Sequence, residues 1–302
     1  MMTQRQANLI LATVSVAWGS SYIFMKISVA EIPPITIIAL RFCIAFIVMF
    51  AIFFKKIIHV NTKTLHYSAI SGAILLGIFV SLMYGMKNTT ASTAGFLTST
   101  TVILVPVLQI FITHKLPSKK IAWGVLIVTT GLALLMISDD MNFGSGAFFC
   151  LVASLFNAVH IIVTNRFVHE VNALQLGIYQ LGFATLYAII STFLFETPVL
   201  PNDMIQWFAI FGLALICSAY GFVMQTIVQK YTTPTSVSFL FSLEPVFTGI
   251  FAFIFLHEIM GLQGYFGAVL ILAGVLIANS TSKKQSKKRF SKEKRRIVEE
   301  RY

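Results

Sequence analysis

Two oppositely charged side chains lie deep inside long apolar stretches of this sequence. Glu244 is near the centre of the stretch 235–256, and Arg41 is close to the middle of the stretch 34–54. A charge inside such a helix costs roughly 2.5–3.5 kcal/mol on insertion scales, so it usually faces a cavity or a partner. Glu244 could carry a coupling proton, contact a solute, or support the chain beside Pro245. Arg41 could bind a solute carboxylate, pair with Glu244, or bond to backbone carbonyls.

Lys26 is a third charged residue within an apolar stretch, closer to its outer end. Its long side chain can extend to place the amine at the membrane interface. The alternative is a gate or an anion contact.

His160 and Asn157 are three residues apart, which places them on one face of a helix. An imidazole titrates near physiological pH, so His160 is a second candidate for proton coupling. Hydrogen bonds between helices are the alternative reading of each uncharged polar residue.

The elements that must position these residues are ten apolar segments. Hydrophobic residues make up 57% of the 302 residues and charged residues only 11%, which excludes a soluble enzyme, a disulfide-rich secreted scaffold and a disordered chain. Each segment is long enough to cross a hydrocarbon core. We therefore predict an all-α polytopic membrane protein with ten transmembrane helices, at 8–29, 34–54, 67–86, 92–113, 120–138, 145–165, 174–194, 205–228, 235–256 and 261–280.

The positive charges predict the orientation. With the N-terminus in the cytoplasm, 19 of the 22 Lys and Arg residues lie in inner segments, and Lys87 is the one in an outer loop. The positive-inside rule then favours both termini in the cytoplasm. The basic tail 281–302 is expected to lie on the anionic inner leaflet rather than to bind nucleic acid. A bacterial cytoplasmic membrane is the expected location, and a homodimer is an open alternative to a monomer.

An internal repeat divides the chain. Residues 87–134 align with 230–277 without a gap, with the same order of polar turn, helices and glycines. The predicted halves are 7–138 and 144–280. Five helices in each half give the halves opposite orientations, an arrangement common in secondary transporters with a site near the midplane.

The repeat brings the candidate residues together. It places Asn157 near Trp18 and Gln180 near Arg41. We therefore predict one cavity lined by Trp18, Arg41, Asn157, His160, Gln180 and Glu244. Secondary cavity candidates are Tyr84, Gln109, Tyr187, Tyr220 and Gln225.

Short motifs in a fixed order resemble those of the EamA-type group of the drug/metabolite transporter superfamily. They are Ala17-Trp18-Gly19-Ser20-Ser21-Tyr22 with Lys26, then Leu40-Arg41-Phe42, Gly95-Phe96-Leu97 with Pro106, and Leu243-Glu244-Pro245-Val246 with His257-Glu258. The similarity covers residues 7–280. It implies a five-plus-five helix fold that moves small organic solutes, such as amino-acid-like metabolites or drugs, by alternating access, with export as the expected direction. One departure is Lys115, where family members often carry an acidic residue.

Other functions receive less support from the sequence. It contains no phosphate-binding loop and no His-Glu-x-x-His motif, so neither ATP-driven pumping by this chain nor catalysis is expected, and no metal or cofactor is predicted. Three alternatives remain open: an importer of a sugar, vitamin or amino acid, an integral membrane enzyme acting on lipid, and a membrane scaffold that transports nothing.

Overall fold

The computed structural model describes residues 2–137, 144–256 and 262–280. Helices fill these ranges, and no strand occurs among the residues described. The expectations for Glu258 and for the basic tail 281–302 lie outside the described residues. The helices are α1 (Gln4–Val29), α2 (Pro34–Ile57), α3 (Thr62–Lys87), α4 (Ala91–Thr98), α5 (Thr101–Thr113), α6 (Lys119–Ile137), α7 (Ser145–Phe167), α8 (Ala173–Phe195), α9 (Met204–Gly212), the π-helix η1 (Leu213–Tyr220), α10 (Gly221–Gln229), α11 (Pro234–Phe241), α12 (Glu244–Leu256) and α13 (Leu262–Ser280).

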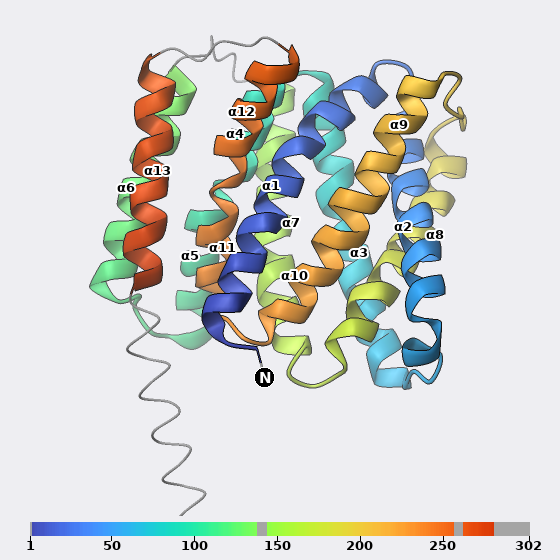
Figure 1. Cartoon of the computed structure of the whole chain (residues 1–302), viewed down its shortest axis with the longest axis horizontal. Helices are drawn as coiled ribbons and strands as arrows, with labels where there is room; N and C mark the ends of the chain where they lie inside the picture. The colour runs from blue at the N-terminus through green and yellow to red at the C-terminus, as the bar shows by residue number, and fades with distance from the viewer. Residues whose placement is uncertain (1, 138–143, 257–261, 281–302) are drawn as a thin grey trace, which may run out of the picture.

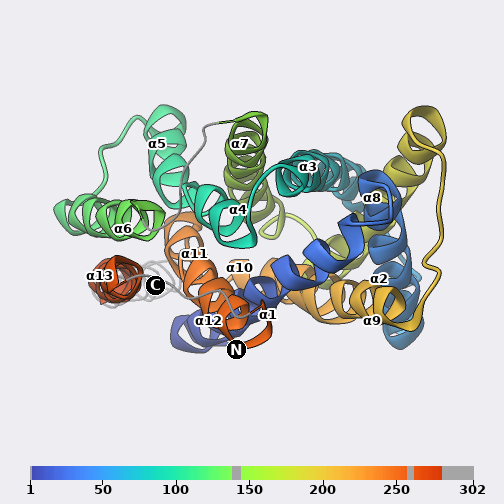
Figure 2. The same cartoon turned by 90° about the horizontal axis from the view of Figure 1, so that it is seen from above.

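Eight segments of the described chain are long and apolar enough to cross a membrane. Three of them combine shorter elements: α4 with α5, α9 with η1 and α10, and α11 with α12. The helices stand side by side in one bundle, with α6 and α13 paired at one edge (Figures 1 and 2). Large apolar side chains such as Phe193, Phe208 and Phe255 are exposed on the outside. This apolar exterior suits contact with lipid rather than water.

Polar side chains interrupt the predicted helix 92–113. It is broken at Ser99 and Thr100, between α4 and α5. The hydroxyls of these two residues donate to the carbonyls of Gly95 and Leu97, at 2.9 and 2.6 Å. Such local bonds compete with the regular helical ladder. The break lies inside the bundle, where backbone groups can find partners away from lipid.

The predicted helix 235–256 has a matching break. It falls at Ser242 and Leu243, between α11 and α12, and Ser242 Oγ donates to the carbonyl of Phe239 at 2.6 Å. The shift along the chain that takes Ala91, where α4 begins, to Pro234, where α11 begins, is the shift of the sequence repeat. The same shift takes both bounds of α5 to those of α12 and both bounds of α6 to those of α13. The repeat found in the sequence therefore also relates the helix bounds of the structure.

The predicted helix 205–228 is continuous but changes its winding. Its middle third is η1, whose wider turns separate α9 from α10. Such π-turns occur frequently at functional sites. The Cys217 carbonyl within η1 accepts a hydrogen bond of 2.9 Å from Trp18 Nε1. This hydrogen bond links α1 to the π-helix in the second half of the chain.

Candidate functional site

A cavity lies where α1, α2, α3, α4, α7, α10 and α12 meet. It is small in this structure, with about 30 Å³ of space for the centre of a water molecule, and one side of it is open. Four of the six predicted site residues line it: Trp18, Arg41, Asn157 and Glu244. The remaining lining residues are Ser21, Tyr22, Ile78, Phe79, Leu82, Thr98 and Phe222.

Glu244 occupies a special place in the backbone. It is the first residue of α12, directly after the break at Ser242 and Leu243, and its side chain is largely buried. A helix N-terminus carries a partial positive charge and unpaired N–H groups, so it stabilises a carboxylate. The broken helix therefore presents an acid to the cavity with local support from the backbone. Tyr22 lies beside it, and its hydroxyl shares a 2.8 Å hydrogen bond with Thr98 Oγ1.

Arg41 is held by contacts on two sides. Its Nε donates to Ser218 Oγ at 2.9 Å, and its Cζ lies 4.2 Å from the centroid of the Phe79 ring. The side chain is only 1% exposed. Its Nη1 is buried and has no hydrogen-bond partner among the described residues. Arg41 therefore keeps a free donor at a cavity wall, a position from which it can bind an anion.

Arg41 and Glu244 do not neutralise each other. Within the described residues, the ion pairs with N–O distances up to 4.0 Å all involve Glu170, at one end of the bundle. The alternative in which Arg41 pairs with Glu244 is therefore not realised among the described residues. The two charges line one cavity separately, together with apolar and aromatic side chains.

Trp18 forms an aromatic wall. Its ring centroid lies 4.9 Å from that of Phe222 and 4.6 Å from that of Phe241. Gly221 packs directly against the indole, since a Cβ there would collide with Trp18 Nε1. The indole is thus fixed by tilted ring contacts, by the missing side chain at Gly221 and by its hydrogen bond to the Cys217 carbonyl.

His160 and Gln180 do not line the cavity. Both are fully buried and bonded to each other, with His160 Nε2 and Gln180 Oε1 3.1 Å apart. The Phe222 carbonyl can only accept, so Thr226 Oγ1 donates to it and in turn accepts from Gln180 Nε2. Gln180 Oε1 therefore accepts from His160 Nε2, which leaves Nδ1 as an acceptor without a partner among the described residues. The pair ties α7 to α8 and α10.

Lys26 lies away from the cavity. Its Nζ donates to the Thr89 carbonyl, in the turn between α3 and α4, at 3.1 Å, and the residue is exposed. The side chain reaches an end of the bundle, as the interfacial reading predicts. Its predicted alternative as a gate stays a prediction.

Several important residues were not among the predicted site residues. Ser218 holds Arg41, and Phe79 supplies the ring beneath the guanidinium. Neither stands out in the sequence, because Ser and Phe are common in apolar helices. Tyr22 could have been predicted as a site residue, because it belongs to the motif that begins at Ala17. Of the secondary candidates, Tyr220 is partly exposed, whereas Gln225 is fully buried.

Comparisons with known proteins agree with this architecture. The model of the EamA-like transporter family matches twice, at residues 5–137 and 144–280. The chain belongs to the EamA-like transporter family. It is therefore a multi-pass membrane protein, and the family points to a transporter rather than an enzyme.

The matches with individual relatives cover most of both chains. An uncharacterized transporter of Archaeoglobus fulgidus is 30% identical over 281 residues, covering 90% of this chain and 85% of the relative. The uncharacterized transporter YoaV of Bacillus subtilis is 23% identical and covers 90% and 96%. One crystal structure matches with a TM-score of 0.76 and 18% identity over 93% of this chain and 99% of the other, which shows a shared fold.

Proposed function

We propose that this EamA-like chain is a secondary transporter that exports small organic solutes, amino-acid-like metabolites or drugs, by alternating access. The observation that carries the proposal is the cavity that Arg41 and Glu244 both line without pairing. An uncompensated charge in a buried site is costly. A solute that carries both charges compensates both residues at once.

The cavity suits a zwitterion with an apolar side. The solute's carboxylate would accept from the free Nη1 of Arg41, and its ammonium would lie against the Glu244 carboxylate. Its apolar part would pack on the walls formed by Trp18, Phe79 and Phe222. A neutral solute would leave both charges uncompensated and should bind less tightly.

Glu244 also offers a coupling mechanism. A proton on its carboxylate removes the attraction for an ammonium group, so proton and solute would compete for one site. Competition of this kind is the basis of antiport, in which an inward proton drives an outward solute. His160 is a second candidate, because its Nδ1 is an acceptor without a described partner.

We further propose that the architecture is two inverted five-helix repeats, with ten membrane-spanning helices that include α6 and α13. The matched bounds of α4 to α6 and α11 to α13 support this. So does the contact between α6 and α13, where a Cβ on Gly131 would meet the Gly267 carbonyl and one on Gly274 would meet the Gly124 carbonyl. The repeat aligns Gly131 with Gly274 and Gly124 with Gly267, so each contact is the other with the halves exchanged. Reciprocal contacts of this kind are what a two-fold axis between the halves produces.

The proposed location is a bacterial cytoplasmic membrane with both termini in the cytoplasm. The charge distribution supports the orientation. The ends of α2 and α7 and the start of α3 lie at the end of the bundle where α1 begins (Figure 1), and these helix ends carry Lys55, Lys56, Arg166 and Lys63. We call this end the N-terminal face. The relative in Bacillus subtilis supports a bacterial setting.

Untargeted mass spectrometry of the growth medium tests the function. Cells expressing the intact chain are compared with cells expressing Glu244→Gln at the same membrane level. We expect a compound with a carboxylate and an amine to accumulate in the medium only with the intact chain. Flux of that compound into inverted vesicles, with and without a proton gradient, then tests coupling.

The other outcomes are equally informative. Equal accumulation with Glu244→Gln would keep export but remove Glu244 from the path. A compound that accumulates inside the cells instead would indicate import. Arg41→Lys serves as a charge-conserving control: it keeps the positive charge but loses the Nε donor to Ser218 and the flat face on Phe79. We expect flux to fall by about tenfold, the loss of one charge-assisted bond.

A further inference from the structure

The cavity is connected to a line of buried polar groups that none of the contacts so far explains. On α10, Gln225 and Gln229 are fully buried, and the side-chain amides of both have no partner among the described residues. Ser218, in η1, accepts from Arg41, and Phe222 lines the cavity. Counted from Ser218 through Phe222 and Gln225 to Gln229, the spacings are four, three and four residues. These spacings keep all four on one helix face. The cavity-facing side of α10 therefore continues toward its C-terminus as unpaired amides.

Helix α3 repeats the pattern in the opposite chain direction. Below the cavity-lining Phe79 come Ser71, Ser68 and Thr64 at helical spacing through Leu75. All three hydroxyls are buried and lack a partner among the described residues. Polar groups between membrane helices normally bond to one another. Here they are buried but not bonded.

Helix α7 supplies a third line. Asn157 lines the cavity, and His160 and Thr164 follow it at spacings of three and four residues. His160 Nδ1 is the unpartnered acceptor described above. Asn165 Nδ2, one residue further, donates to the Gln229 carbonyl at 2.9 Å, which joins the ends of α7 and α10. The three lines run from the cavity to the same end of the bundle, the N-terminal face.

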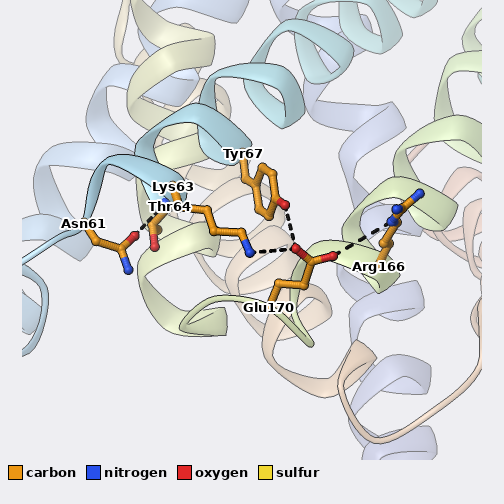
Figure 3. A network of polar contacts seen from close by, with 6 residues as sticks. All are labelled: Asn61, Lys63, Thr64, Tyr67, Arg166 and Glu170. Atoms are coloured by element: carbon orange, nitrogen blue, oxygen red, sulfur yellow. Dashed lines mark hydrogen bonds and ion pairs between the residues drawn. The ribbon is translucent and has the colours of Figure 1, made fainter.

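A charged cluster joins two of these helices at that end. Glu170, in the turn after α7, accepts from Lys63 Nζ at 2.8 Å and from the Tyr67 hydroxyl at 2.6 Å (Figure 3). Arg166 Nε lies 3.9 Å from its other oxygen. Tyr67 also stacks on Phe167, with parallel rings 3.9 Å apart. We call Lys63, Tyr67, Arg166, Phe167 and Glu170 the Glu170 latch.

Unpaired buried amides are unfavourable in a structure with a single state. They are understandable if water reaches them in a second state. We propose that Ser68, Ser71, His160, Gln225 and Gln229 form the closed half of the solute path, between the cavity and the N-terminal face, with the Glu170 latch closing its mouth. This assignment rests on the proposed transport function. It places specific residues on a route that opens when the latch separates α3 from the end of α7.

Accessibility of introduced thiols tests the path without knowledge of the solute. Ser71→Cys and Gln225→Cys place a thiol on it. Ile70→Cys is the matched control, since Ile70 adjoins Ser71 at the same depth but is exposed on the outside of the bundle. A charged, membrane-impermeant maleimide is applied to inverted and to right-side-out vesicles, and the unmodified chain gives the background of its three native cysteines. Only the hydrated thiolate reacts.

We expect both path positions to react at least about tenfold faster than Ile70→Cys, and only from the side of the N-terminal face. Adding Glu170→Gln should raise their rates by about threefold, the scale of one exposed ion pair, and leave Ile70→Cys unchanged. Because Ser71→Cys is nearly isosteric, it keeps the test valid if Gln225→Cys fails to fold.

Two results would overturn the proposal. Rates equal to that of Ile70→Cys, with or without Glu170→Gln, would make these residues packing groups. Reaction from the opposite side alone would place the path elsewhere. Fast labelling combined with no solute flux in vesicles would instead count against the transport function and leave the hydrated path in place.

Discussion

The two broken helices of this protein have the same backbone and different chemistry. Helices α4 and α5 break at Ser99 and Thr100, and α11 and α12 break at the equivalent positions of the repeat, Ser242 and Leu243. The first residue after each break is Thr101 in one copy and Glu244 in the other. Thr101 Oγ1 donates to the carbonyls of Thr98 and Ser154, at 2.7 and 3.1 Å.

This difference separates architecture from function. Both breaks lie at equivalent positions of the sequence repeat. One copy alone places a charge at the new helix N-terminus, and that charge faces the cavity. Of these two equivalent positions, Glu244 lines the cavity and Thr101 makes a packing contact with Ser154.

Exchanging the residue types is the strongest test of this comparison. Glu244→Thr gives the second break the residue of the first. We expect solute flux to fall by about 10- to 100-fold, the loss of one charge-assisted contact of about 1.5–3 kcal/mol. Transport of the compound found by mass spectrometry into vesicles measures it.

The matched control is Thr101→Val, which removes the hydroxyl from the first break. It should lower the thermal stability slightly and leave flux within about twofold, because the hydroxyl it removes bonds to the carbonyls of Thr98 and Ser154 and to Ser154 Oγ rather than facing the cavity. Equal loss of flux in both variants would show that the break itself, rather than the Glu244 carboxylate, determines transport.

Much of this arrangement could be predicted from the sequence, because the charge of a residue and the length of an apolar stretch can be read from a short part of the chain. Eight of the ten predicted spans, the gapless repeat and the buried charges Arg41 and Glu244 could be found without the structure. The breaks could not, although the run Thr98-Ser99-Thr100-Thr101 contains the signal, since such hydroxyls bond to nearby carbonyls. A run of Ser and Thr also occurs in unbroken membrane helices, so the pattern alone does not decide.

The cavity itself was harder to predict from the sequence. His160 and Gln180 were expected in it and instead bond to each other between helices. Their placement depends on the rotation of α7 against α8, which helical spacing within one segment does not fix. Phe79 and Ser218 were missed for the same reason: each matters through the neighbour it meets, Arg41, from another helix.

The α6–α13 contact is where the two halves should respond alike. A Cβ on Gly131 would lie 2.6 Å from the Gly267 carbonyl, and one on Gly274 would lie 2.6 Å from Val128 Cγ2. Gly131→Val and Gly274→Val should each destabilise the protein by about 1–3 kcal/mol through overpacking. Thermal unfolding in detergent measures both. Ala133→Val, exposed on the same helix as Gly131, is the control and should change little.

Similar losses at Gly131 and Gly274 would support the two-fold relation between the halves. A large loss at one position and none at the other would contradict it. Together with the Glu244→Thr variant, this experiment tests whether the glycine contacts of the two halves are equivalent while the residues at their helix breaks are not.

The smallest expected effect concerns the carboxylates at the two ends of the bundle. At one end, Glu196 accepts from the backbone N–H groups of Ile35 and Thr36, at 3.0 Å, and so caps α2. At the other end, hydrogen bonds from Lys63 and Tyr67 hold the pKa of Glu170 below its ordinary value. A lowered pKa means that the latch adds stability above about pH 4.3, the ordinary pKa of Glu, and loses it as the pH falls through the folded value.

Glu170→Gln should therefore lower the thermal stability slightly at pH 7, since exposed ion pairs contribute little. The difference from the intact chain should disappear once Glu170 is protonated in both the folded and the unfolded chain. Thermal unfolding of both proteins from pH 7 down to pH 3 measures this. A difference that persists at pH 3 would mean that the carboxylate acts through its shape and its bond to Tyr67 rather than through its charge. The latch would then be a fixed joint, whereas a charge-dependent latch can be released by a change of ionic strength or pH.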